Sequence, residues 1–212
     1  MRTSTARAAG RLVAALRHGR ALHPRGMLLA GTIQIENPVL GERGEHEVLA
    51  RLSKGLSLPG RLPDVLGLAV RLPDGVDLLL STGLFGRVPF PRRSFTSGPY
   101  SSLTSYRCGT RVRPLVARPE GPWAPADPAL LPRALPLVFH LWTGTRYLAR
   151  LLLREALPGR DLTFDPVLNS RPDLHPVGRL QRLRRDVYAG SREGRDAALT
   201  GRPTPAEPGR PS

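Results

Sequence analysis

Side chains able to do acid–base or metal chemistry are sparse in this chain and lie far apart. It has five histidines and one cysteine, Cys108, and none of them forms a His-x-x-x-His or Cys-x-x-Cys element. A zinc site therefore has no support. Asp173 and His175 are the one close His–Asp pair that a metal-dependent phosphodiesterase could use, and Pro176 beside them indicates a turn. No Walker loop, Gly-x-Ser-x-Gly element or dinucleotide fingerprint is present.

Four separate segments carry the polar residues that could form one site. Arg184 and Tyr188 are four residues apart, which places both on one face of a helix. The segments are Arg20 to Gly26 followed by Gly31-Thr32, Arg51 to Ser53, Asp64 to Leu72 followed by Asp77-Leu78, and Phe164-Asp165-Pro166 followed by Arg184, Tyr188 and Arg195.

In this order and spacing the segments resemble the haem-dependent catalases and the catalase-related peroxidases. That family has Arg-x-x-His-x-x-Gly, then Arg-Phe-Ser, then a run of the type Asp-x-x-Gly-Phe-Ala-Val-Lys-Phe before Asp-Leu. Near its end it has Phe-x-Pro, followed at fixed offsets by Arg, Tyr and Arg. The match covers most of the chain from Arg20 to Arg195, with Leu52 in place of the family's Phe.

The resemblance implies a haem b site. Tyr188 would bind the ferric iron as phenolate, and Arg184 one helical turn earlier would help to keep that phenolate ionised. His23 would move a proton between the two oxygens of a bound peroxide, and Ser53 would orient its imidazole. The haem propionates would meet three arginines, Arg20, Arg51 and Arg195.

The chain departs from the family pattern in two respects. The family has an Asn a few residues after Asp-Leu, whereas here Leu80-Ser81-Thr82 occupy that region, so only a hydroxyl could donate there. The chain is also much shorter than a full catalase, which suits an open pocket and peroxidase chemistry with a small reductant better than peroxide dismutation. Such an open pocket equally suits a non-catalytic barrel that has lost haem.

The formal charge of +15 allows a third reading, a basic module that binds nucleic acid or anionic lipid. The arginines are spread along the whole chain, however, and Lys54 is the only lysine, which is typical of a GC-rich genome. A nucleic-acid partner is therefore not expected. The single cysteine and the lack of a long apolar run favour a cytoplasmic protein without a membrane span. Whether it is a monomer or a dimer stays open.

The elements that must position these residues are mostly short strands. Glycine and proline together make 45 residues, which favours turns and argues against a helical bundle. Thr143-Gly144-Thr145 is typical of a hairpin turn, so we expect Arg146 to Glu155 to be a strand rather than a helix. We expect strands over Gly26–Glu36, Glu47–Ser53, Val65–Leu72, Val76–Thr82, Tyr106–Ala117, Leu135–Thr143, Arg146–Glu155 and Asp161–Phe164.

Together these expectations predict a mainly β member of the α+β class, a catalase-like antiparallel eight-stranded β-barrel with a helix at each end. The helices are expected over Thr5–Arg20 and Leu174–Arg195, and a proline-rich loop over Arg118–Pro132. The expected organisation is an N-terminal arm over 1–22, a barrel domain over 23–196 and a disordered tail over 197–212, which holds four prolines. Cys108 is expected to be a small core residue.

Overall fold

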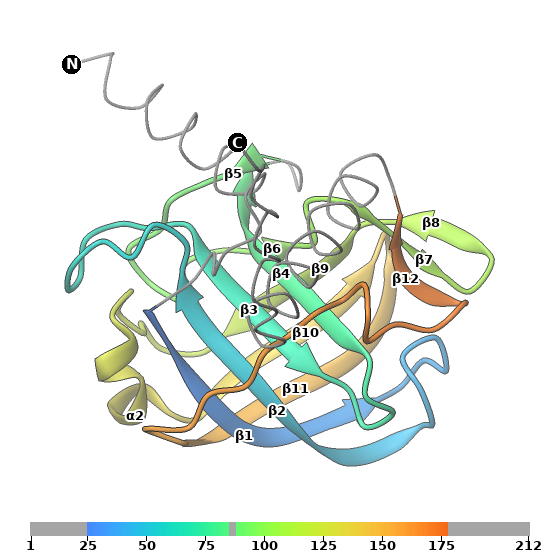
Figure 1. Ribbon diagram of the computed structural model, residues 1–212, viewed down its shortest axis with the longest axis horizontal. Coiled ribbons are helices and arrows are strands. Elements are labelled where there is room, and N and C mark those ends of the chain that lie inside the picture. The colour runs from blue at the N-terminus through green and yellow to red at the C-terminus, as the bar shows by residue number, and fades with distance from the viewer. Residues whose placement is uncertain (1–24, 85–87, 178–212) are drawn as a thin grey trace, which may run out of the picture.

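A closed eight-stranded antiparallel β-barrel forms the body of the molecule (Figure 1). The computed structural model describes residues 25–84 and 88–177. Around the barrel the strand order is β3-β2-β1-β11-β10-β9-β6-β4, and pairing of β3 with β4 closes the ring. These strands are β1 (Arg25–Ile35), β2 (Gly44–Lys54), β3 (Leu66–Arg71), β4 (Asp77–Leu84), β6 (Tyr100–Ser101), β9 (Leu115–Glu120), β10 (Leu137–Thr143) and β11 (Arg146–Ala156).

The prediction of an eight-stranded antiparallel barrel is thus confirmed. Strands β1, β2, β3, β4, β10 and β11 lie where the sequence predicts them, with ends shifted by a few residues. The hairpin at Gly144 is confirmed as well, because Thr143 pairs with Arg146 across the turn and β11 continues to Ala156. The predicted helix over Thr5–Arg20, most of the predicted C-terminal helix and the tail lie outside the described residues.

The single strand predicted over Tyr106–Ala117 is wrong. This stretch forms β7 (Ser105–Cys108), β8 (Arg111–Arg113) and the start of β9. Gly109 turns the chain back between β7 and β8 with a φ of 62°, and Pro114, which has no N–H to give to a ladder, separates β8 from β9. The alternation of Cys108, Thr110 and Val112 in the sequence runs across the turn at Gly109 and hid it, although the pairing of Cys108 with Arg111 shows that the alternation shifts by one residue there.

Three further expectations are corrected. Asp161–Phe164 is not a strand, and the eighth barrel strand is the short β6. The expected loop over Arg118–Pro132 begins later, after β9 ends at Glu120, and it leads into the 3₁₀ turn η1 (Pro128–Leu130) and the helix α2 (Leu131–Ala134). The predicted C-terminal helix does not begin at Leu174, because β12 (Leu174–Val177) pairs there with β7.

One further short strand lies outside the ring. The two-residue β5 (Val88–Pro89) pairs with β4.

Strict alternation along the strands fills the barrel with aliphatic side chains. In β3, for example, Leu66, Leu68 and Val70 are at most 1% exposed and point inward. Cys108 belongs to the same buried cluster, as the sequence predicts. At one end of the barrel, the only lysine of the chain, Lys54, is buried and its Nζ donates hydrogen bonds to the carbonyl oxygens of Gly60 and Leu62 at 2.9 and 3.1 Å. Desolvation lowers the pKa of this lysine.

Two aromatic residues, from β6 and β10 on either side of β9, meet in the core. The rings of Tyr100 and Phe139 meet edge to face, with their centres 5.7 Å apart, and both side chains are fully buried. The Tyr100 hydroxyl donates to the carbonyl oxygen of Phe95 at 2.9 Å, which satisfies the only polar atom of the pair's side chains. Burial raises the pKa of Tyr100 far above its usual value.

We predict that Phe139→Ala lowers the free energy of unfolding by about 4 kcal/mol, because it leaves a cavity in a close-packed core. Leu168→Ala is the matched control. Leu168 is 57% exposed, so its truncation should change the free energy by less than about 0.5 kcal/mol. Urea denaturation followed by circular dichroism measures both values, and equal effects would contradict the assignment of Phe139 to the core.

Candidate functional site

Two of the seven residues predicted for the site, Arg51 and Ser53, lie within the described part of the chain. They stand two positions apart on β2, so their side chains leave the same face of the strand. Leu52 between them is fully buried in the core, which places Arg51 and Ser53 on the outside of the barrel. The other five predicted residues, Arg20, His23, Arg184, Tyr188 and Arg195, lie outside the described residues.

Ser53 belongs to a row of residues with almost no side chain. Directly opposite residues in an antiparallel ladder share a face. Gly26 pairs with Ser53, Ser53 with Gly67, Gly67 with Ser81, and Ser81 with Ser101. We call these five residues, on β1, β2, β3, β4 and β6, the Gly/Ser row. It gives the outward side of five neighbouring strands a line of positions with no side chain larger than a hydroxymethyl group, and Ser53, Gly67 and Ser101 in this line are buried.

The row next to it is apolar except for one arginine. Leu28, Arg51, Ala69 and Leu79 are paired in that order across β1 to β4. Arg51 lies close to the Gly/Ser row, because a Cβ atom added to Gly26 would come within 3.0 Å of Arg51 Nε. The same Cβ would lie only 2.9 Å from the Leu52 carbonyl oxygen, so this position accepts only glycine without a shift of the backbone.

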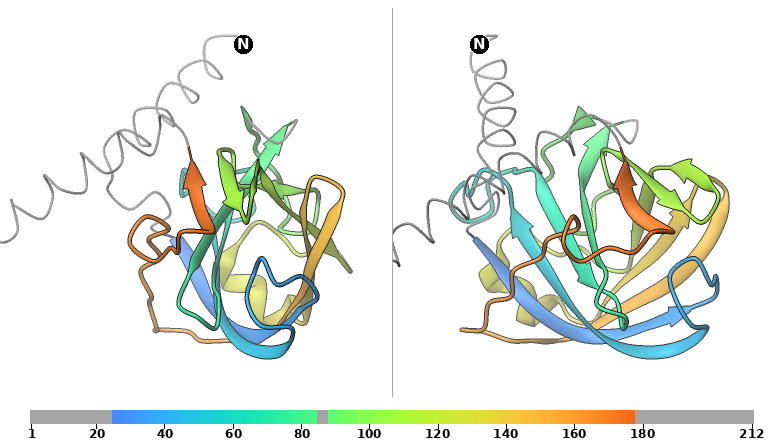
Figure 2. Two further views of the ribbon diagram at one scale, coloured as in Figure 1. Left: turned by 90° about the vertical axis from the view of Figure 1, so that its right-hand side faces the viewer. Right: turned by 45° about the vertical axis from the view of Figure 1, so that its right-hand side comes forward.

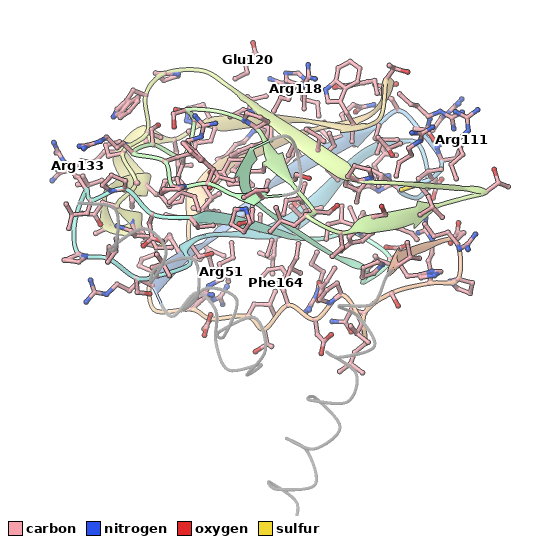
Figure 3. The ribbon with its side chains drawn as sticks, turned by 90° about the horizontal axis from the view of Figure 1, so that it is seen from above. Arg51, Arg111, Arg118, Glu120, Arg133 and Phe164 are labelled. Atoms are coloured by element: carbon pink, nitrogen blue, oxygen red, sulfur yellow. The ribbon has the colours of Figure 1, made fainter. Side chains whose placement is uncertain are left out.

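Residues 161–170, which we call the outer strap, run over the outside of β2, β3 and β4 (Figure 2). Asp161 Oδ1 lies 3.5 Å from Arg51 Nε at one end of the strap. Further along, the Arg71 guanidinium lies over the Phe164 ring at 5.4 Å from its centre. Figure 3 shows Arg51 and Phe164 on the same side of the barrel, opposite Arg118 and Glu120.

A buried carboxylate fastens the outer strap to the barrel. Asp77 is fully buried, and its carboxylate accepts hydrogen bonds from Arg71 Nε and Nη2, both at 2.8 Å. It also accepts from the Asp165 N–H and from Asn169 Nδ2, both at 2.7 Å. The hydrogen bond to Asp77 raises the pKa of Arg71. Four donors on one carboxylate compensate for its removal from water.

The hydroxyls that replace the family's Asn are not equivalent. Thr82 points into the barrel and its hydroxyl is used there, because it accepts from the Leu66 N–H at 3.0 Å and donates to the Phe90 carbonyl oxygen at 2.7 Å. Ser81 is in the Gly/Ser row and donates to the Leu66 carbonyl oxygen at 3.3 Å. Of these two hydroxyls, only that of Ser81 is on the same face of the sheet as Ser53.

A cavity of about 480 Å³ borders the end of the Gly/Ser row at Ser101. Gly83, Pro99 and Val116 form part of its lining, and Arg118 contributes its one charged side chain. This volume lies within the range of pockets that hold a drug-sized ligand.

The histidines within the described residues make local contacts instead of forming a metal centre. His140 lies between Glu120, at 2.5 Å, and the Tyr147 hydroxyl, at 3.2 Å, and the bond from His140 lowers the pKa of Glu120. His46 and His175 each contact a backbone carbonyl oxygen four residues earlier. Across residues 25–84 and 88–177, no group of three or more His, Cys, Asp or Glu side chains could hold a metal ion. Asp173 and His175 thus gain no third ligand there.

Sequence reasoning missed most of the Gly/Ser row and the residues that anchor the outer strap. Gly26 and Gly67 stand in the segments that match the family, but only strand pairing shows that they flank Ser53. Asn169, four residues after Asp165, carried no signal of its contact with Asp77. The only feature of the sequence that hinted at this anchor was Asp77, an acidic residue at the start of a predicted apolar strand and six residues after Arg71.

Comparison with known proteins adds no relative. No family model matches the chain, and a search of curated proteins finds no match. In the described part of the chain, no helix is long and apolar enough to cross a membrane.

We predict that Asp77→Asn lowers the free energy of unfolding by about 3 kcal/mol, because it leaves the Arg71 guanidinium beside a neutral amide. It should also loosen the outer strap, which would be seen as faster hydrogen exchange at the backbone N–H of Asn169. Asp161→Asn is the matched control, with a carboxylate that is 80% exposed, and should cost less than about 1 kcal/mol. A strap that stays protected in the Asp77 variant would show that other contacts hold it.

Proposed function

We propose that the protein binds haem b against the outer face of β1 to β4 and uses it in peroxidase-type reactions with hydrogen peroxide or an organic peroxide. The observation that carries the proposal is the Gly/Ser row with Arg51 beside it. This is the surface that bears both of the predicted site residues within the described part of the chain.

The described residues would meet an apolar ring with acidic substituents along β1 to β4. The Gly/Ser row has no large side chain, but it follows the curve of the closed barrel, so a flat ring would contact only neighbouring strands, which lie about 4.8 Å apart. Leu28, Ala69 and Leu79 beside this row would contact the apolar ring. Arg51 would bind one propionate through a charge-assisted hydrogen bond.

Residues outside the described part complete the proposed site, and their roles rest on the resemblance to catalases. The Tyr188 phenolate oxygen would bind the iron, with Arg184 stabilising its negative charge. Arg20 and Arg195 would meet the propionates together with Arg51. When bound, haem supplies the redox chemistry that no side chain of this protein can provide.

The proton-transfer steps fall to His23 and Ser53. His23 stands three residues before Gly26, the residue that pairs with Ser53. In the proposal, His23 takes a proton from one peroxide oxygen and returns it to the other, and the Ser53 hydroxyl holds the imidazole in the required orientation. Ser81 offers a hydroxyl in place of the amide of the family's Asn, which favours oxidation of a small reductant over peroxide dismutation.

We predict that the full chain expressed with added haem precursor has the absorption spectrum of a high-spin ferric haem bound by tyrosinate, with one haem per chain. Tyr188→Phe should abolish this spectrum. Tyr147→Phe is the matched control and should leave it unchanged, because Tyr147 contacts His140 on the opposite face. A colourless but folded protein would overturn the proposal and leave the non-catalytic barrel as the better reading.

We also predict that His23→Ala slows peroxide consumption by about 100-fold or more while haem content stays the same, since a positioned acid–base group typically contributes that much. His46→Ala removes another imidazole, one that contacts the Glu42 carbonyl oxygen, and should have no effect. Stopped-flow mixing with hydrogen peroxide gives the rates. Equal rates for the wild type and the His23 variant would exclude this role for His23.

A further inference from the structure

Three arginines surround a small cavity at the end of the barrel where β7 and β8 lie. Arg111, Arg113 and Arg146 line a space of about 230 Å³ together with Thr143 and Thr145. Figure 3 shows Arg111 at the opposite end of the molecule from Arg133. We call this cavity the arginine pocket, and we propose that it binds a small phosphorylated anion.

Strand register explains why the first two arginines point to one place. In the β7–β8 hairpin, Cys108 pairs with Arg111 and Tyr106 with Arg113, so these four side chains share a face. Tyr106 and Cys108 are buried in the core, which shows that this face is turned toward the barrel. Arg111 and Arg113 therefore lie over the barrel end, although both are exposed.

The third arginine reaches the pocket from a different hairpin. Arg146 follows the turn between β10 and β11 and pairs with Thr143. Thr143 in turn pairs with Leu115 at the start of β9, two residues after Arg113. Two hairpins that are distant in sequence thus bring three guanidinium groups to one cavity, which local composition alone would not produce.

Charge balance at the arginine pocket points to an anionic ligand. No acidic residue lines the cavity. Among the described residues, none of the three arginines forms an ion pair with a carboxylate, whereas Arg71 and Arg171 do. Asp173 lies near Cys108, but its carboxylate is held by Arg171 Nε at 2.7 Å. The three guanidinium groups repel one another when no counterion is present. A bound anion would attract all three and offset this repulsion.

The size and donors of the pocket narrow the ligand class. A cavity of about 230 Å³ is smaller than the 300–1,000 Å³ typical of drug-sized ligands, so a phosphate or diphosphate group fits better than a whole cofactor. Guanidinium forks match phosphate oxygens in pairs, and the exposed Thr145 hydroxyl adds a donor. Burial raises the pKa of the Cys108 thiol, which keeps it neutral beneath the anion. The pocket is therefore a binding site rather than a nucleophilic one.

Isothermal titration calorimetry of the full chain with sodium pyrophosphate, in about 0.15 M salt to screen distant charges, tests the proposal. We expect saturable binding at one site per chain. The double variant Arg111→Gln/Arg146→Gln should weaken it at least tenfold. The double variant Arg61→Gln/Arg133→Gln removes the same charge from two exposed positions away from the pocket and should stay within twofold of the wild type. Equal weakening by both variants, or binding that does not saturate, would overturn the site.

A second measurement needs no variant. In ¹H–¹⁵N NMR spectra of the wild-type chain, pyrophosphate should shift the amide signals of Gly144 and Thr145, which line the pocket, and leave that of Ala134 in α2 unchanged. Inorganic phosphate should shift the same signals with lower affinity, since it offers fewer oxygens to three guanidinium groups. Shifts spread over the whole surface, or none at Gly144 and Thr145, would contradict the proposal even if the variants fold poorly.

Discussion

Hydrogen-bonded pairing continues around eight strands and returns from β4 to β3, so the position of each strand is fixed by two neighbours. In such a closed ladder a residue either fills the interior or faces outward, and its register partners face the same way. Most polar side chains of the strands therefore face outward, and Thr82 is an exception whose hydroxyl is hydrogen-bonded inside the barrel. The Gly/Ser row and the adjacent row of Leu28, Arg51, Ala69 and Leu79 both follow from this constraint.

The outer strap depends on the barrel through a few strong contacts. Four hydrogen bonds to the buried Asp77 carboxylate join β3, β4 and residues 165–169. The Arg71 guanidinium also donates to the Thr163 carbonyl oxygen at 2.9 Å and lies over Phe164. Because the strap carries Asp161 toward Arg51, the same anchor sets the charge environment of the proposed propionate-binding arginine. The Arg71–Asp77 ion pair therefore helps to position Asp161 beside Arg51.

Arginine serves at least three purposes in this protein, and net charge alone does not separate them. Arg71 and Arg171 are held by carboxylates, Arg51 borders the proposed haem surface, and Arg111 with its two neighbours surrounds a cavity without a carboxylate. Lys54, the only lysine, differs from these arginines. It is buried at one end of the barrel, and its ammonium group donates hydrogen bonds to two carbonyl oxygens. A compact ammonium suits that position better than a planar guanidinium fork.

The sequence alone predicted six of the barrel strands, because inward residues recur in them at every second position, and it predicted an eight-stranded antiparallel barrel although two of its other strands were wrong. The resemblance to the catalases also singled out Arg51 and Ser53, and these lie two positions apart on one strand and share a face. The sequence could not locate β6, which is too short to show a period, or the β7–β8 turn, because the sequence alternation of Cys108, Thr110 and Val112 runs across that turn. Only the tertiary structure decided that Gly26 and Gly67 flank Ser53, that Ser81 continues the row beyond Gly67, and that Arg146 joins Arg111 and Arg113, because these arrangements depend on which distant strands pair and in which register.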